Sequence, residues 1–247
     1  MNTFTRKTLY AAVAGAATIG VASTARAVNV SADGLGQVLI YPYYTVKNNA
    51  AGQAYNTLMS VVNTTASTKA VKVRFREGRN SVEVLDFNVF LSPFDVWTAA
   101  ITPGVGITGT TDFGAQIQTA DKSCTIPSFP ANGNGVQFRT LGLESGDNAA
   151  ARTQEGYIEV FEMATMTGAT AAKALHVNGT PACGITDAGA AADQAPPGGG
   201  IFGGLTIVNP AGGGAFSQAA TALANFNPAA AYSTTGNLSP QYADAVP

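Results

Sequence analysis

The sequence predicts an all-β fold, an antiparallel β-sandwich of Ig-like or jelly-roll-like topology with long Gly/Ala-rich loops. Apolar and polar residues alternate with a period of two in several segments. Turn-forming residues recur about every ten residues, which is the spacing of sandwiches and barrels. No segment has the 3.6-residue apolar period of an amphipathic helix. Together these observations favour two packed sheets over a helical architecture.

The first strands follow one another closely. They are expected over 37–41, 56–63, 71–76, 81–91 and 95–101. Pro42 predicts an edge strand or a bend at that point, because proline donates no hydrogen bond to a neighbouring strand. In 71–76, Val and Phe alternate with Lys and Arg, so this strand is expected to bury one face and expose the other to water.

The strand signal weakens after Pro103 and returns later in the chain. Between Pro103 and Thr119 small and polar residues dominate, which predicts a long loop or poorly defined strands. Further strands are expected over 136–141, 156–163 and 204–209. The aromatic and β-branched content of 156–163 predicts a central position in its sheet.

The Gly/Ala-rich segments predict loops and short irregular elements. Region 164–190 can hold one short helical turn, and 219–226 is either a strand or a short helix. Segment 191–200 contains Pro196, Pro197 and three consecutive glycines, so we expect a loop or linker that cannot pack a core. The predicted organisation is a signal peptide over 1–27, a β-sandwich domain over 28–228, and a low-complexity tail or the start of a further region over 229–247.

The N-terminus has the pattern of a secretory signal peptide. Arg6 and Lys7 precede an apolar stretch over 10–21, and Ala25-Arg26-Ala27 has the small-x-small pattern of a cleavage site. The apolar run is too short for a membrane span. We therefore predict cleavage after Ala27 and a secreted, periplasmic or cell-surface protein with no transmembrane segment in its mature chain.

The charge of the mature chain argues against several classes of partner. Removing 1–27 deletes three of the thirteen basic residues and none of the fifteen acidic ones, so the formal net charge changes from −2 to −5. A polyanion such as nucleic acid would be repelled. Charged residues make up only 11% of the chain, whereas typical soluble domains have about 25%. This composition is typical of exported β-proteins.

The two cysteines predict one disulfide. Cys124 and Cys183 both remain in the mature chain, and export would place them in an oxidising compartment. A redox pair or a metal site is the alternative. No Cys-x-x-Cys spacing is present, and His176, the single histidine, lies apart in the sequence, which disfavours both alternatives.

The search for catalytic residues predicts a protein that is not an enzyme, with no catalytic residues, no metal and no cofactor. His176 lacks a Gly-x-Ser-x-Gly nucleophile motif to pair with. Four carboxylates on predicted strands are candidates for glycoside hydrolysis, namely Glu83, Asp86, Glu159 and Glu162. The alternative is a solvent-exposed ladder of ion pairs between these carboxylates and the basic residues of 71–76, worth about 0–1 kcal/mol a pair.

Four aromatic side chains predict a binding surface for a glycan or a partner protein. They are Tyr41, Tyr43, Tyr44 and Trp97. Such rings combine apolar faces with a polar atom, which suits them to both ligands. Core packing is the alternative for most of them.

Several segments resemble a group of exported proteins of Gram-negative bacteria. The resemblance is carried by 33–44, 56–65, 73–81 and 86–93. It implies a β-rich surface or periplasmic protein that is part of a longer chain, and it carries over no catalytic residue, because the group has no assigned activity. We therefore expect a non-enzymatic cell-surface or extracellular structural or adhesive component, self-assembling through exposed strand edges such as 37–44. A carbohydrate-binding module of a longer secreted protein is the alternative.

Overall fold

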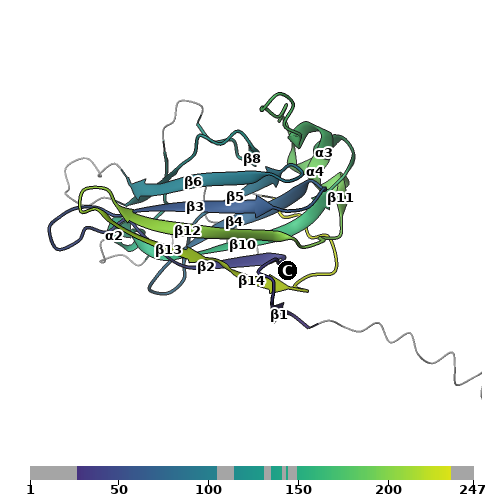
Figure 1. The fold of residues 1–247 in the computed structure, drawn as a ribbon. Coiled ribbons are helices and arrows are strands. Elements are labelled where there is room, and N and C mark those ends of the chain that lie inside the picture. Colours follow the sequence, from purple (N-terminus) through teal and green to yellow (C-terminus); the bar gives the residue numbers. More distant parts are fainter. Residues whose placement is uncertain (1–26, 105–113, 131–134, 141–142, 144–148, 235–247) are drawn as a thin grey trace, which may run out of the picture.

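The computed structural model describes residues 27–104, 114–130, 135–140, 143 and 149–234. Except for Ala27, the predicted signal peptide lies outside the described residues. The described chain forms two antiparallel sheets packed face to face (Figure 1), which confirms the all-β sandwich. The choice between Ig-like and jelly-roll-like topology stays a prediction.

The first sheet, sheet A, has the strand order β1-β14-β2-β10-β4-β5-β8, and β11 pairs with β10. Its strands are β1 Asn29–Val30, β2 Val38–Thr45, β4 Lys69–Glu77, β5 Glu83–Leu91, β8 Cys124–Ile126, β10 Glu155–Met166, β11 Gln194–Ala195 and β14 Thr221–Ala224. The expected strand 156–163 lies in β10, which pairs with both β2 and β4, so the prediction of a central position is confirmed.

The second sheet, sheet B, has the strand order β13-β12-β3-β6-β7-β9. Its strands are β3 Asn56–Asn63, β6 Val96–Pro103, β7 Ala115–Gln118, β9 Val136–Gln137, β12 Ile201–Asn209 and β13 Gly214–Ala219. Three short helices complete the described elements, α2 Ala149–Arg152, α3 Gly168–Ala174 and α4 Asp187–Ala192. Region 164–190 therefore holds α3 and most of α4, more helix than the single turn expected.

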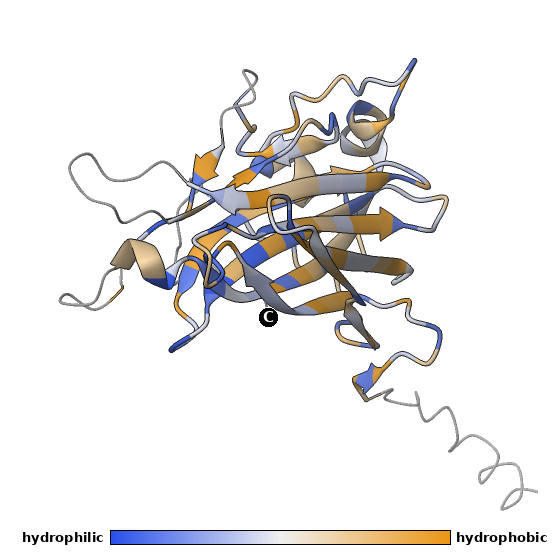
Figure 2. Cartoon of the chain, turned by 60° about the vertical axis from the view of Figure 1, so that its left-hand side comes forward, coloured by the Kyte–Doolittle hydropathy of each residue, from blue (hydrophilic) through white to orange (hydrophobic). Residues whose placement is uncertain are grey.

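The core lies between the two sheets and is rich in aromatic rings. Figure 2 shows hydrophobic residues concentrated along the strands. Phe87 of sheet A contacts Trp97 of sheet B with ring centroids 5.6 Å apart, and Phe75 lies 4.8 Å from Phe138. Such pairs add about 0.5–1.5 kcal/mol to the free energy of burial. The aromatic residues of the strands thus fix how the two sheets stack.

Pro42 lies in a β-bulge of a central strand. Its strand, β2, is hydrogen-bonded to β10 on one side, and on the other side β14 pairs with it only over 38–40, so Pro42 lies both at a bend and beyond the paired part of that second side, as expected. The register against β10 shifts between Tyr41 and Tyr44, where one extra residue of β2 is accommodated. A bulge leaves one residue without a ladder partner, which suits a residue that has no N–H to donate.

The glycine-rich segment 191–200 is fixed to sheet A rather than acting as a linker. The carboxylate of Glu162 accepts hydrogen bonds from the N–H groups of Gly198, at 3.0 Å, and Gly199, at 2.7 Å. Gly199 and Gly200 have positive φ angles of 73° and 80°, which glycine adopts at little cost. The expectation that this segment cannot pack is wrong, because a buried carboxylate satisfies its backbone donors.

The segment 225–234 crosses the outer face of sheet A. Phe226 lies 5.6 Å from Phe161 by ring centroids, and the N–H of Ala231 donates to the carbonyl of Met163 at 2.9 Å. Asn88 donates to the Tyr232 hydroxyl at 3.2 Å. The first residues of the predicted tail, 229–234, therefore pack against the sandwich.

The predicted disulfide is confirmed. Cys124 in β8 is bonded to Cys183, which follows α3, with Cα atoms 5.4 Å apart. The bond links a short edge strand of sheet A to the helical region that covers one end of the same sheet (Figure 1).

Candidate interaction surface on sheet B

Three of the four aromatic residues predicted to bind a ligand lie in the core. Tyr41, Tyr44 and Trp97 are each 0% exposed. The Tyr41 hydroxyl donates to the carbonyl of Ser60 at 2.7 Å, and the Tyr44 hydroxyl donates to a backbone carbonyl at 3.1 Å. Burial raises the pKa of both tyrosines. The four residues do not form a shared surface, and core packing explains three of them.

Tyr43 is the exception, with 43% of its surface exposed. Its hydroxyl donates to Oε2 of Glu155 at 3.0 Å. Partial burial and the Glu155 carboxylate raise the pKa of Tyr43. The bulge at Pro42 explains this exposure, because strict alternation would turn Tyr43 to the same inner face as Tyr41.

The predicted ion pairs exist, but they are buried or half-buried rather than exposed. The pairs on the outer face of sheet A are Lys72–Asp86 at 3.1 Å, Arg74–Glu83, the half-buried Arg76–Glu159 at 2.7 Å, and Lys69–Glu162 at 2.6 Å, whose lysine lies outside 71–76. The side chains of the Lys72–Asp86 pair are both 0% exposed. The expected water-exposed face is wrong because α3, α4 and the segment 225–234 pack on it, from sequence positions far from the strands.

Burial changes the pKa values of two carboxylates in these pairs. Burial raises the pKa of Glu162, and the Lys69 ammonium group opposes that shift. Burial likewise raises the pKa of Glu83 against the lowering effect of Arg74. The four carboxylates considered for glycoside hydrolysis are each paired with a cation, and none of them lines the groove described below.

His176 belongs to a polar cluster that the sequence did not indicate. Its Nδ1 lies 3.0 Å from Oγ of Ser92 and 3.5 Å from Oδ2 of Asp95. The Ser92 hydroxyl also donates to Asp95 at 3.1 Å. In a catalytic triad the serine and the aspartate contact opposite ring nitrogens, whereas here both approach Nδ1. The cluster holds the segment after α3 against the turn between β5 and β6.

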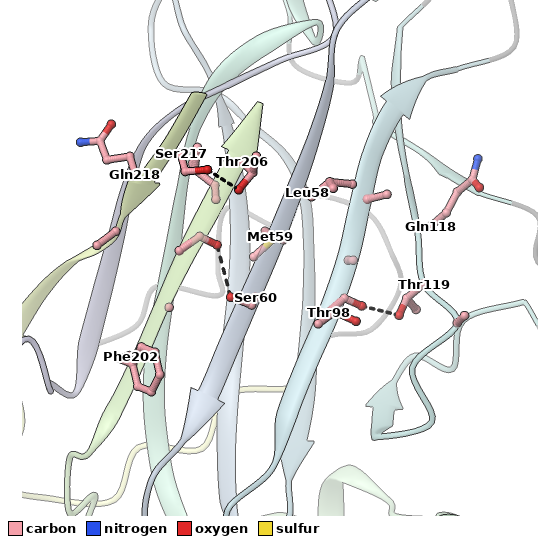
Figure 3. A pocket seen from close by; sticks show the side chains of 17 residues that line it. Leu58, Met59, Ser60, Thr98, Gln118, Thr119, Phe202, Thr206, Ser217 and Gln218 are labelled. Carbon is pink, nitrogen blue, oxygen red and sulfur yellow. Dashed lines mark hydrogen bonds between the residues drawn. The ribbon is translucent and has the colours of Figure 1, made fainter. Parts of the chain in front are cut away.

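A shallow groove runs across the outer face of sheet B (Figure 3). It has a volume of about 1030 Å³ and is lined by side chains of β3, β6, β12 and β13, with further residues at and after the end of β7. The labelled lining residues are Leu58, Met59, Ser60, Thr98, Gln118, Thr119, Phe202, Thr206, Ser217 and Gln218. None of the described residues that line it is charged. Leu58 is 45% exposed and Phe202 is 40% exposed, so the groove presents apolar area to solvent.

The hydroxyl groups in this groove bond mainly to one another and to the backbone. Thr206 Oγ1 and Ser217 Oγ are 2.8 Å apart, which joins β12 to β13. Thr119 Oγ1 donates to the carbonyl of Thr98 at 2.6 Å. The polar atoms of the surface are thereby partly satisfied, which lowers the cost of covering it.

The strand β13 forms an open edge beside the groove. All six of its residues are exposed, including Phe216 at 59%. It pairs with β12 in uninterrupted register, and it contains no charged residue and no proline. Natural edge strands are usually protected by lysine, proline, a bulge or short length. By contrast, the other sheet ends in the described part of the chain are β1, β8 and β9, of two, three and two residues.

Within the described ranges, no group of three or more His, Cys, Asp or Glu side chains is placed to hold a metal ion. No helix in that part of the chain is long and apolar enough to cross a membrane. No family model, curated protein or solved structure matched the chain.

Proposed function

We propose that this chain is an exported, non-enzymatic structural or adhesive component of the cell surface or extracellular space, which self-associates through sheet B. The observation that carries the proposal is the six-residue open edge of β13 next to an uncharged groove. An exposed edge offers its unpaired N–H and C=O groups to a strand of another chain, and such strand addition is a recurrent mode of assembly.

The distribution of charge supports association through this face. The mature chain has a predicted net charge of −5, which would oppose contact between copies. Among the residues that the structure describes, no acidic side chain belongs to the groove lining or to β13. Two copies can therefore meet through sheet B without bringing carboxylates together. The 124–183 disulfide supports the exported location, since such bonds persist mainly in oxidising compartments.

Sedimentation velocity and negative-stain electron microscopy of the chain from Val28 onward test the proposal. We expect concentration-dependent assemblies. Ala215→Lys places a charge on the groove side of β13 and is expected to weaken association by about tenfold or more, because the ammonium group would be desolvated at the contact. Ala188→Lys, an equal charge change on exposed α4, is the control and should leave association unchanged. A chain that stays monomeric at high concentration, or equal effects of both variants, would refute the proposal.

The alternative function, carbohydrate binding, would have to use a different set of residues from the four aromatic residues predicted. Tyr41, Tyr44 and Trp97 are enclosed in the core and cannot stack on a sugar. Tyr43 remains exposed, and it lines a second cavity, which shares Leu205 and Gln218 with the lining of the groove on sheet B.

A further inference from the structure

The second cavity lies at a seam between the two sheets. β14 pairs with β2 only over Val38, Leu39 and Ile40, so the rest of β2 has no strand on that side in the described part of the chain. There β2 faces β12 and β13 of sheet B, which run beside it at the lower edge of the molecule in Figure 1. The cavity between them has a volume of about 460 Å³. Binding sites for small ligands typically measure about 300–1,000 Å³.

Three aromatic rings from three different elements line this cavity. They are Tyr43 of β2, Tyr55 just before β3, and Phe216 of β13. Tyr43 is 43% exposed and Phe216 is 59% exposed. None of the three contacts another aromatic ring among the described residues. None of the three belongs to the buried hydrophobic core.

The bulge at Pro42 is what brings Tyr43 to this cavity. β2 reads buried at Tyr41, exposed at Pro42 and Tyr43, and buried again at Tyr44. Two consecutive exposed residues between two buried tyrosines interrupt the alternation of an ordinary strand. Bulges of this kind are enriched next to functional sites, where they redirect a side chain.

The polar groups of the cavity fit a neutral ligand with several hydroxyl groups. Asn48, Gln218 and Thr45 belong to its lining, and the first two carry side-chain amides. Amides both donate and accept hydrogen bonds, as a sugar hydroxyl requires. The one cation in the lining, Lys47, forms an ion pair with Glu155 and so has its charge balanced. Aromatic faces beside amide groups match a pyranose ring, which has apolar C–H faces and a polar rim.

We propose that this cavity binds a neutral pyranose unit of a glycan, with Tyr43, Tyr55 and Phe216 contacting the faces of the sugar. The site adjoins the groove, with Leu205 and Gln218 in both linings, but none of its three aromatic rings lines the groove, and sugar binding does not require self-association. Its test is made at concentrations where the chain is monomeric, because Phe216 also belongs to the open edge β13.

Glycan-array binding followed by calorimetry with neutral and acidic oligosaccharides tests the site. We expect binding of neutral sugars and a loss of about tenfold or more in affinity for Tyr43→Ala and for Tyr55→Ala, since each removes one stacking ring. Tyr43→Phe keeps the ring, loses the hydrogen bond to Glu155, and should retain most of the affinity. Phe94→Ala removes a 69% exposed aromatic ring that does not line the cavity and should have no effect.

Saturation transfer from aromatic protons of the wild-type chain to the sugar provides a readout that needs no variant. We expect the strongest transfer to the C–H groups of one sugar face. Binding of acidic glycans alone, no neutral sugar bound, or unchanged affinity in folded Tyr43→Ala would overturn the assignment. A negative result in these binding experiments would not change the sedimentation results. The two proposals can therefore fail independently of each other.

Discussion

Glu77 organises the turn that follows β4. Its carboxylate accepts hydrogen bonds from the N–H groups of Arg79, Asn80 and Val82, at 3.0, 2.9 and 3.2 Å. Arg152 lies 3.1 Å from the same carboxylate, with side chains 4% and 0% exposed for the pair. Burial by itself would raise the pKa of Glu77, but these donors outweigh it and hold the pKa below its ordinary value. The charged form is the one that the fold requires.

Glu77→Gln is expected to lower the free energy of unfolding by about 3–5 kcal/mol at neutral pH, because it leaves the buried Arg152 guanidinium without its counter-charge. Urea denaturation measures this change. Glu155→Gln is the matched control, since the Lys47–Glu155 pair is 46% and 36% exposed and should be worth about 0–1 kcal/mol. Similar losses in both variants would contradict the role assigned to Glu77.

The difference between wild type and Glu77→Gln should also depend on pH. A carboxyl whose pKa is lowered by folding contributes stability above its unfolded pKa, and that contribution is lost as pH falls through the folded pKa. The reference value for Glu77 is 4.5. The difference in unfolding free energy should therefore be full at neutral pH and shrink as the pH falls below about 4.5. Denaturation across this range checks it, and a difference independent of pH would exclude a charge-based effect.

At the scale of the element, Tyr232 joins the segment 225–234 to sheet A. Its hydroxyl donates to Asp187 at 2.7 Å, and its ring centroid lies 6.3 Å from that of Phe90. Tyr232→Phe removes two hydrogen bonds of the hydroxyl, one to Asp187 and one from Asn88, and should cost about 1–3 kcal/mol. Tyr232→Ala should cost about 3–5 kcal/mol, because packing is also lost. Thermal unfolding ranks the two variants, and equal costs would mean that the ring does not pack as described.

The disulfide restrains a second element that covers sheet A, the helical region around α3. Its cysteines are 59 residues apart in sequence, so replacing both with serine should lower the free energy of unfolding by about 4 kcal/mol in the chain-entropy model. Unfolding with and without reductant measures the effect. Reductant should reproduce the loss in the wild type and add nothing in the double variant; a further loss there would indicate an effect unrelated to this bond.

Local sequence pattern predicted the strands well because alternation and turn residues are local signals. Val71, Val73 and Phe75 are buried as their spacing predicted. The environment of the opposite face could not be predicted, since Lys72 is 0% exposed and the neighbouring Asn88 bonds to Tyr232 from a distant part of the chain. The same limit applies to the candidate sites. The sequence groups Tyr43 with three residues that lie in the core, and only the bulge at Pro42 separates its position from that of Tyr41 and Tyr44.

On the scale of the whole molecule, the outer faces of sheet A and sheet B differ in their charge and in how far other elements cover them. The outer face of sheet A carries ion pairs beneath helices and the segment 225–234, whereas the groove of sheet B is uncharged and open. The alternation in 71–76 predicts that the charged face of this strand is exposed to water, whereas the structure covers it. The difference arises because the burial of a sheet face depends on tertiary packing rather than on its own strands.

This arrangement predicts how salt affects self-association. Contacts through an uncharged face should not weaken as salt rises to about 0.5 M, because no attractive ion pairs are screened and repulsion between the acidic copies is reduced. Sedimentation at low and high salt measures the response. Dissociation on adding salt would show that ion pairs hold the copies together and would exclude the groove as the contact.

The lengths of the edge strands also limit the symmetry of any assembly. β13 is the longest strand at an end of either sheet in the described part of the chain, and two copies joined β13 to β13 would cover that edge in both. Such a contact uses the same patch on each partner and closes as a two-fold dimer. Growth into a lattice or filament would then require a second, non-equivalent contact, so dimers would be the repeating unit, and odd-numbered species should be scarce.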